Sequence, residues 1–336
     1  MPLHKIEIKG PHAGPRLLIV GGVHGDEFEP MVAAQRVAQY LQSHSDELHG
    51  QVTLIPIVNE AAFARGNRVA EDEKDLARTC PGSPNGTVTE QIAAQLSEEI
   101  NHTDYFIDLH TGGTRIAVYP LAGYMLHPDS AVLEDSRRMA RAFGLPIIWG
   151  TTSRLEGRSL SVARDALVPA IYAEYLGGGT CSPRGVRAYV QGCLNVLHEL
   201  GMLRGEPPRF DPGTASEFVT LTIEDDRENA GHMQVQHPAP MSGLWIPEVE
   251  LGAFVKTGDR IGTISSPAAD VQREIVSSQT GLVLCLRTFC RVDEGEFLAV
   301  ILEPRSESDV AVMQQISTQQ PLFMHSVSLR QLINSI

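Results

Sequence analysis

The sequence has few basic side chains for its length of 336 residues, and its charge balance is strongly acidic. It contains 27 Lys and Arg against 41 Asp and Glu, which gives a net charge of −14. Nucleic acids and anionic membrane surfaces both need a basic footprint on the protein that binds them. The composition therefore excludes these partners, and an anionic small molecule would have to be attracted by local cations.

Long apolar runs and closely paired cysteines are also missing. No stretch approaches the roughly 18 apolar residues of a membrane span, and the opening MPLHKIEIKG lacks the apolar core of a signal peptide. The five cysteines include no Cys-x-x-Cys pair, although Cys285 and Cys290 could be considered as a disulfide. We expect reduced thiols and a cytoplasmic protein.

What is present, over about residues 1–205, is an alternation of strand-like and helical segments. Amphipathic helices are predicted over 28–41 and over 87–100, where Thr87 and Glu90 have capping-box spacing. Short β-rich runs lie at 16–20, 52–58, 104–109, 146–149 and 169–175. Because these runs are apolar at nearly every position, they predict an α/β fold whose mostly parallel sheet is covered by helices on both faces.

The alternation stops at GEPPRFDPG (205–213), and the chain beyond it contains two similar halves marked by turn glycines, 243–264 and 281–301. A doubled β-hairpin unit of this kind is typical of a small all-β barrel-sandwich. We therefore predict four parts: a first domain over 1–205, a linker with an entry strand over 206–234, a β barrel-sandwich over 235–305 and a tail over 306–336.

This second unit resembles the barrel-sandwich fold of biotinyl and lipoyl carriers, which present a modified lysine on the hairpin between the two halves. The corresponding segment here, SSPAADVQREIVSSQ (265–279), contains no lysine. A structural lid or an oligomerisation module is the better interpretation, and a homo-oligomer stays open as an alternative to a monomer.

The stretch GGVHGDEFEP (21–30) directly follows an apolar strand and places His24 three residues before Glu27. The same His-x-x-Glu spacing recurs at 4–7 and at 44–47. In the first of these the alternating strand pattern turns the two side chains to opposite faces, and the second lies in a polar turn. Only His24 and Glu27 lie where a predicted parallel strand ends.

Other polar residues share this position. His110 ends one predicted strand, Asn59 ends another, and Glu174 lies near the end of a third. The carboxyl ends of parallel strands meet at one edge of a sheet, where α/β proteins gather their sites. His24, Glu27 and His110 form a His₂Glu set that leaves a fourth position open, which is typical of catalytic zinc. We predict one Zn²⁺ per chain.

Further groups are expected around this ion. Asp108 shares a strand face with His110 and is suited to hold its imidazole. Glu174, a carboxylate in an otherwise apolar segment, is the candidate base for water and acid for a leaving amine. The glycine-bearing loop 64–82 supplies cations for a developing oxyanion or a substrate carboxylate, namely Arg65, Arg68 and Arg78.

Six stretches in this order resemble the succinylglutamate desuccinylase/aspartoacylase family, relatives of the zinc carboxypeptidases. They are GGVHGDE, NEAAFARGNR, DLAR, CPG, DLHTGG and AEYLGGG, and they span about residues 15–200. Within this family, deacetylases and deacylases of N-acylated diamino acids have the same two-part build.

The resemblance implies a role for each matching residue. Metal ligation falls to His24, Glu27 and His110, and the roles of general base and acid fall to Glu174. Arg68 would polarise the scissile carbonyl, Arg78 would clamp a substrate carboxylate, and Asn59 would help to order the loop that carries them.

Two positions depart from the family pattern. Ala77, in DLAR, stands where the family usually has an asparagine that helps to hold the substrate carboxylate, and Glu60 stands where proline commonly follows Asn59. Losing one such hydrogen bond costs about 0.5–1.5 kcal/mol. We therefore expect altered substrate choice and intact chemistry.

The leading hypothesis is a zinc amidohydrolase that removes an acyl group from a small N-acylated amino acid or a related amine. A metallocarboxypeptidase acting on short peptides is the alternative among hydrolases. A binding protein that has lost its chemistry, suggested only by Ala77, is the alternative from another class. The choice of substrate depends on the loops 113–130 and 150–165, which carry Arg115, Arg154 and Arg158.

Overall fold

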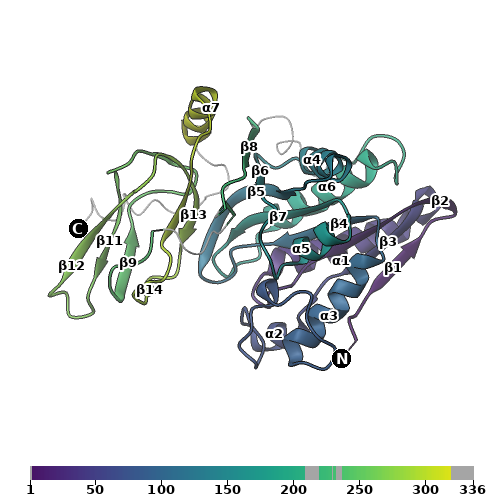
Figure 1. The fold of residues 1–336 in the computed structure, drawn as a ribbon, viewed down its shortest axis with the longest axis horizontal. Coiled ribbons are helices and arrows are strands. Elements are labelled where there is room, and N and C mark those ends of the chain that lie inside the picture. Colours follow the sequence, from purple (N-terminus) through teal and green to yellow (C-terminus); the bar gives the residue numbers. More distant parts are fainter. Residues whose placement is uncertain (1, 209–218, 229, 232–236, 319–336) are drawn as a thin grey trace.

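A large β-sheet forms the centre of the protein (Figure 1). The computed structural model describes residues 2–208, 219–228, 230–231 and 237–318. In spatial order, six strands of the sheet are β1 (Ile6–Lys9), β3 (His49–Ile55), β2 (His12–Val20), β4 (Tyr105–His110), β7 (Ala170–Gly177) and β5 (Ile116–Leu126). Strands β3, β2, β4 and β7 run parallel, whereas β1 and β5 pair antiparallel with β3 and β7. The α/β class is confirmed, and the sheet is mixed where the sequence predicted a mostly parallel one.

The sheet branches at β5. The second half of β5 pairs in parallel with β6, which in turn pairs in parallel with β8. The first residues of β5 pair antiparallel with β13. Strand β13 also pairs antiparallel with β10 and β15. These five strands are β6 (Ile147–Thr152), β8 (Leu221–Asp225), β10 (Phe254–Val255), β13 (Gly281–Arg287) and β15 (Ala299–Leu302). Three strands from the last third of the chain therefore belong to the same sheet as the first two hundred residues.

Helices cover both faces of this sheet, as predicted. Three of them share a buried core with Leu109 on one face, and two share a second core with Phe106 on the other. The first group is α1 (Phe28–Ser43), α4 (Ser130–Phe143) and α6 (Pro183–Glu199), and the second is α3 (Val88–Asn101) and α5 (Ser159–Asp165). Shorter helices lie at α2 (Glu60–Arg65), η1 (Ser45–Glu47) and η2 (Leu76–Arg78).

A separate four-stranded antiparallel sheet lies beside β13 (Figure 1). It consists of β12 (Gln272–Val276), β11 (Arg260–Ser265), β9 (Gly243–Pro247) and β14 (Arg291–Val292). Its Trp245 packs in the same hydrophobic cluster as Leu121 of β5 and Trp149 of β6. The antiparallel character predicted here is confirmed in part. A closed barrel is not, because the strands of this region are divided between two sheets. The domain boundaries near 205 and 235 stay a prediction.

Strand β5 lies within 113–130, a segment predicted from the sequence to be a loop. Pro120 and Gly123 weaken a strand signal, since proline cannot donate to a ladder and glycine has no side chain to pack. In the structure Pro120 falls where the pairing of β5 with β7 is interrupted, between Val118 and Leu121. The irregularity accommodates the proline without the loss of a ladder hydrogen bond.

The linker and the tail are described only in part. Within the segment predicted as a linker with an entry strand (206–234), the structure describes β8, which pairs with β6 in the large sheet, while 209–218, 229 and 232–236 lie outside the described residues. The tail begins with α7 (Glu307–Thr318), whose Met313 and Ile316 are buried in the cluster around Trp245. The remainder of the tail, 319–336, also lies outside the described residues.

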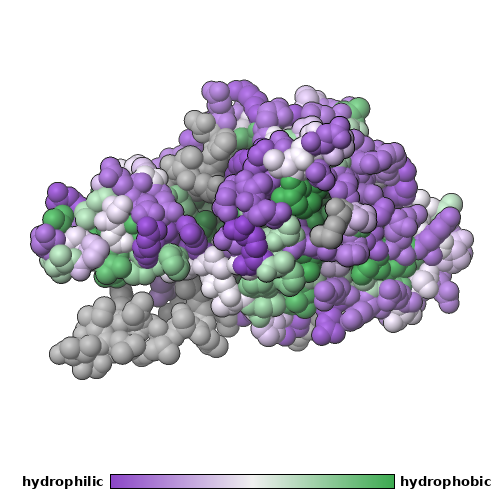
Figure 2. Space-filling view, turned by 90° about the horizontal axis from the view of Figure 1, so that it is seen from below, coloured by the Kyte–Doolittle hydropathy of each residue, from purple (hydrophilic) through white to green (hydrophobic). Residues whose placement is uncertain are grey.

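The surface agrees with the acidic, polar composition. The face shown in Figure 2 is mainly hydrophilic, with smaller apolar patches between the polar ones. Within the described ranges, no helix combines the length and the apolar character needed to cross a membrane. None of the five cysteines forms a disulfide bond, and Cys285 is buried whereas Cys290 is exposed.

The hydrophobic cluster that joins the two sheets predicts that two leucines contribute very differently to the free energy of unfolding. Leu282 on β13 is fully buried at 0% exposure, and Leu244 on β9 is 42% exposed. Leu282→Ala should lower the free energy of unfolding by about 2–5 kcal/mol, because it removes core contacts and leaves a cavity. The control Leu244→Ala should change it by less than about 0.5 kcal/mol. Urea unfolding followed by circular dichroism measures both, and equal effects would contradict this view of the core.

Candidate metal and active site

The turn between β2 and α1 carries the first two candidate metal ligands. Strand β2 ends at Val20, and Glu27 is the N-cap residue of α1. Gly25 lets this turn pack against α2, since a Cβ atom at this position would lie 2.1 Å from the carbonyl carbon of Ala62. The tight turn holds His24 and Glu27 in the interior, where they are 3% and 1% exposed.

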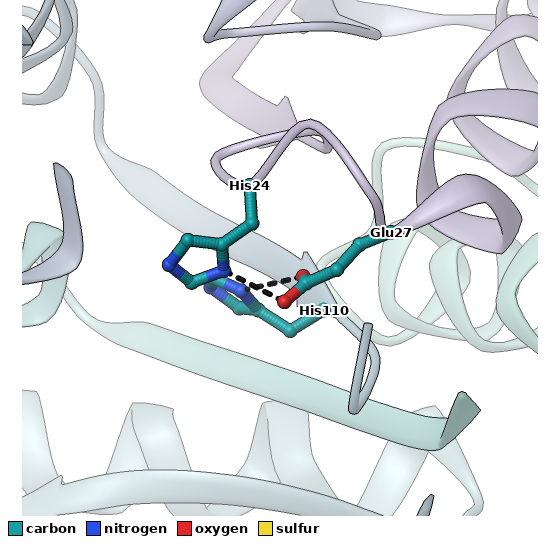
Figure 3. Close-up of side chains that lie close together, drawn as sticks. All are labelled: His24, Glu27 and His110. Carbon is teal, nitrogen blue, oxygen red and sulfur yellow. Dashed lines mark hydrogen bonds and ion pairs between the residues drawn. The ribbon is translucent and has the colours of Figure 1, made fainter. Parts of the chain in front are cut away.

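The third candidate ligand comes from the neighbouring strand. His110 is the last residue of β4, and Figure 3 shows its ring next to that of His24, with both rings directed toward the Glu27 carboxylate. Glu27 Oε1 lies 2.7 Å from His24 Nδ1, and Oε2 lies 3.1 Å from His110 Nδ1. One ligand atom of each residue lies within 4.8 Å of the others. No second cluster of this kind occurs in the part of the chain that the structure describes, including the other His-x-x-Glu pairs.

Each imidazole also has a carboxylate on its far side. His24 Nε2 lies 3.1 Å from Asp75 Oδ1, and His110 Nε2 lies 2.9 Å from Asp108 Oδ1. The second oxygen of Asp75 accepts a hydrogen bond from Nη2 of Arg68 at 3.1 Å. Carboxylates in such positions fix the ring orientation and the tautomer, which leaves Nδ1 of each histidine available to a metal.

The charges of the cluster fit a divalent cation. Burial raises the pKa of Glu27, but His24 and His110 lower it more, so the pKa lies well below its usual range. Burial lowers the pKa of His110, whereas Asp108 and Glu27 raise it well above its usual value. A metal binds neutral imidazole and must displace the bound protons. Two ring nitrogens and one carboxylate oxygen are a donor set that Zn²⁺ accepts.

Glu174 lies directly beside this cluster. It is paired with His110 in the parallel register of β4 and β7, so both side chains point to the face covered by α3 and α5. Glu174 is 7% exposed, and its Oε2 atom has no hydrogen-bond partner among the described residues. Burial raises the pKa of Glu174 to about 7. A carboxyl group with this pKa can both accept and release a proton near neutrality.

One cavity contains these groups and several arginines. Arg68 lies at its metal end, where Nη1 is 3.6 Å from Glu27 Oε1. Arg78 also lines the cavity and donates from Nη1 to the carbonyl of Ala77 at 2.8 Å. Arg158 approaches from the start of α5, and its Nη2 atom is buried without a hydrogen-bond partner in the described structure. Burial, with a smaller contribution from Arg78, lowers the pKa of Arg158 to about 10.

Several predicted residues lie elsewhere. Asn59 is absent from the cavity lining, and its Oδ1 accepts the backbone N–H of Ala62 at 3.0 Å as the N-cap of α2. Arg65 forms an ion pair with Glu73 (2.9 Å) at the surface. Arg115 pairs with Glu296 at 3.2 Å, and Arg154 is exposed and not among the lining residues.

The structure also brings in residues that sequence reasoning missed. Asp75 stands in the quoted DLAR stretch, so its position was available, but not its role between His24 and Arg68. Tyr172 shares a strand face with Glu174 at a spacing of two, a signal that was not used. Cys285 and Phe297 line the cavity from beyond residue 280, and nothing in their local sequence indicates a site.

An α/β sheet with two histidines, a buried carboxylate and a second carboxyl group at its strand ends defines a candidate metallohydrolase. The model of the succinylglutamate desuccinylase/aspartoacylase catalytic domain matches residues 13–200, and this chain belongs to that family. The resemblance found in the sequence motifs is thereby confirmed.

Individual relatives cover nearly the whole chain. N-alpha-acetyl-L-2,4-diaminobutyric acid deacetylase of Halomonas elongata is 29% identical over 86% of this chain and 82% of its own length. A succinylglutamate desuccinylase/aspartoacylase structure from Rhodobacter sphaeroides has a TM-score of 0.79 at 28% identity and covers 91% of this chain and 90% of that one. The product-bound ectoine utilization protein EutE (DoeB) of Ruegeria pomeroyi has a TM-score of 0.79 at 27% identity, covering 89% and 88%.

The bridging position of Asp75 predicts a role in metal affinity. Asp75→Asn removes the charge that holds His24 Nε2 and should weaken the binding of a divalent metal by about 10- to 100-fold. Competition with a chromophoric chelator measures this affinity. The control Asp104→Asn changes a surface carboxylate that also pairs with an arginine, Arg16 at 2.9 Å, and should leave the affinity unchanged. Equal affinities in all three proteins would contradict the role of Asp75.

Proposed function

We propose that this protein is a zinc-dependent amidohydrolase that removes an acyl group from a small N-acylated amino acid or a related amine. The observation that carries the proposal is the convergence of His24, Glu27 and His110 in one cavity with Glu174, a carboxyl group poised to exchange a proton. Two of the named relatives, a deacetylase and a succinylglutamate desuccinylase/aspartoacylase, carry the names of deacylases, which supports this reaction class.

His24, Glu27 and His110 would hold the zinc ion, with Asp75 and Asp108 behind the two imidazoles. When bound, zinc supplies a Lewis acid that lowers the pKa of water and polarises a carbonyl group. The position of Glu174 beside this cluster then allows its carboxyl group to transfer protons. As a carboxylate it accepts the proton of the attacking water, and as a carboxylic acid it returns that proton to the leaving amine.

The cations of the cavity divide between two tasks. Arg68 lies at the metal end and already balances Asp75 and Glu27, so it is placed to stabilise negative charge on the carbonyl oxygen of the substrate. Arg78 and Arg158 also line the cavity. A substrate carboxylate is the anion that suits two guanidinium groups.

The size of the substrate follows from the cavity walls. Ile116 and Val118 of β5, together with Cys285 of β13 and Phe297, supply apolar or weakly polar surface. Residues from the last third of the chain thus close one side of the cavity, which favours a compact acyl amino acid over a peptide. An acetyl group, as in the name of the Halomonas elongata relative, fits the apolar walls better than a charged acyl chain.

The role of Glu174 predicts a loss of turnover and a characteristic pH dependence. Glu174→Gln removes the base and should lower kcat by about 10²- to 10⁴-fold, while metal content measured by mass spectrometry stays unchanged. In the wild type, kcat/KM should fall as pH falls, because protonation of Glu174 removes the base. The midpoint should lie at or below pH 7, since burial raises the pKa to about 7 and a bound cation opposes that shift. Activity that survives in the Gln variant would contradict the proposal.

A substrate panel tests the reaction class. The zinc-loaded protein should hydrolyse N-acetyl-L-2,4-diaminobutyrate or another N-acetyl amino acid, with N-succinyl amino acids as slower substrates. Release of the C-terminal residue of a tetrapeptide, with no cleavage of acyl amino acids, would instead favour a carboxypeptidase. Binding without turnover throughout the panel would favour a binding protein.

A further inference from the structure

Tyr172 is a polar side chain of the cavity to which the reaction above gives no task. It lies on β7 two residues before Glu174, and the register pairs it with Asp108 on one side and Gly123 on the other. Residues paired in this way point to the same face of a sheet. Tyr172 therefore faces the cavity together with Asp108 and Glu174, and it is one of the lining residues.

The opposite strand leaves space for this ring. A Cβ atom on Gly123 would lie 2.2 Å from Cε1 and Cζ of Tyr172 and 2.5 Å from its hydroxyl oxygen. Any other residue at position 123 would push the ring out of its place. The ring thus lies flat over β5, in a position that a glycine in the middle of a buried strand makes possible.

The hydroxyl group of Tyr172 has no hydrogen-bond partner among the described residues, unlike Tyr124, which donates to Glu224 Oε1 at 2.7 Å. Burial, with Glu174 nearby, raises the pKa of Tyr172 above its usual value, so the hydroxyl stays a hydrogen-bond donor at neutral pH.

Arg158 is the second unsatisfied donor in the same cavity. Its guanidinium makes no hydrogen bond or ion pair within the described ranges, and its electrostatic influence reaches Tyr172. Ala77 lines the cavity as well but offers no side-chain donor. A phenol and a guanidinium without partners, in a cavity that lacks a carboxamide at position 77, are complementary to one anionic group.

We propose that Tyr172 donates a hydrogen bond to the substrate carboxylate, which it shares with Arg158, and so supplies a donor that Ala77 cannot. The inference rests on the proposed function and adds a specificity-determining residue to it. No bond is made or broken by Tyr172. Its contribution is to select acyl amino acids that carry a free carboxylate over neutral analogues of the same size.

The test compares Tyr172→Phe with the wild type in the full-length, zinc-loaded protein. The substrates are N-acetyl-L-2,4-diaminobutyrate and its carboxamide, which has the same shape and no negative charge. We expect kcat/KM for the carboxylate to fall about 10- to 100-fold, as for a lost hydrogen bond to a charged group. The value for the carboxamide should fall less, by about 2- to 10-fold, since a hydrogen bond to a neutral oxygen contributes less than one to a carboxylate.

A matched control removes a phenol elsewhere. Tyr105→Phe loses a hydroxyl that donates to Asp135 Oδ2 at 3.3 Å, away from the cavity lining, and should leave both substrates unaffected. An equal loss on both substrates in Tyr172→Phe, as from a structural role, would overturn the proposal, and so would no loss on either.

Direct binding separates this proposal from the proposed reaction. Calorimetry with the Glu174→Gln protein measures the affinity for N-acetyl-L-2,4-diaminobutyrate without turnover. A Tyr172→Phe/Glu174→Gln protein should bind about 10-fold more weakly or worse. Such a loss would support Tyr172 even if the wild type hydrolysed none of the panel, which would count against the amidohydrolase alone. Unchanged affinity, or no binding by the Glu174→Gln protein, would overturn the role of Tyr172.

Discussion

The contact of the buried Glu27 carboxylate with two imidazoles is the interaction on which the rest of the site depends. A charge removed from water is costly unless partners surround it. His24 and His110 are those partners, and Asp75 and Asp108 compensate for them in turn. Strand β2, strand β4 and the start of α1 are therefore fixed relative to one another by a network of charges that favours occupation by a cation.

Much of this arrangement could be predicted from the sequence, because it depends on local signals. A parallel strand followed by a glycine-rich turn and a helix places its polar residues at the edge of the sheet. The spacing of His24 and Glu27 is visible in the seven residues GGVHGDE. Strand β5 could not be predicted in the same way. Its Pro120 and Gly123 are typical of a loop. Only the neighbouring strand β7 explains them, because its irregular pairing accommodates Pro120 and its Tyr172 ring packs against Gly123.

The cavity walls were beyond local reasoning for a related reason. Arg158 could be named only as one of three arginines in loops expected to set the choice of substrate, because its place in the cavity depends on how α5 packs on the sheet. Cys285 and Phe297 reach the cavity only because β13 pairs with β5, a contact between positions more than 160 residues apart. Long-range pairing of this kind leaves no periodic pattern in either segment, so the residue types give no warning of it.

The pairing of β5 with β13 also bears on how the chain can be divided. The family model ends at residue 200, yet a fragment cut there would lose the partner of the first residues of β5 and the apolar cover over Leu121 and Trp149. An uncovered strand edge next to exposed core residues invites self-association. Truncated versions of this protein should therefore precipitate during expression, and the catalytic half is better regarded as a portion of a larger folding unit than as an independent module.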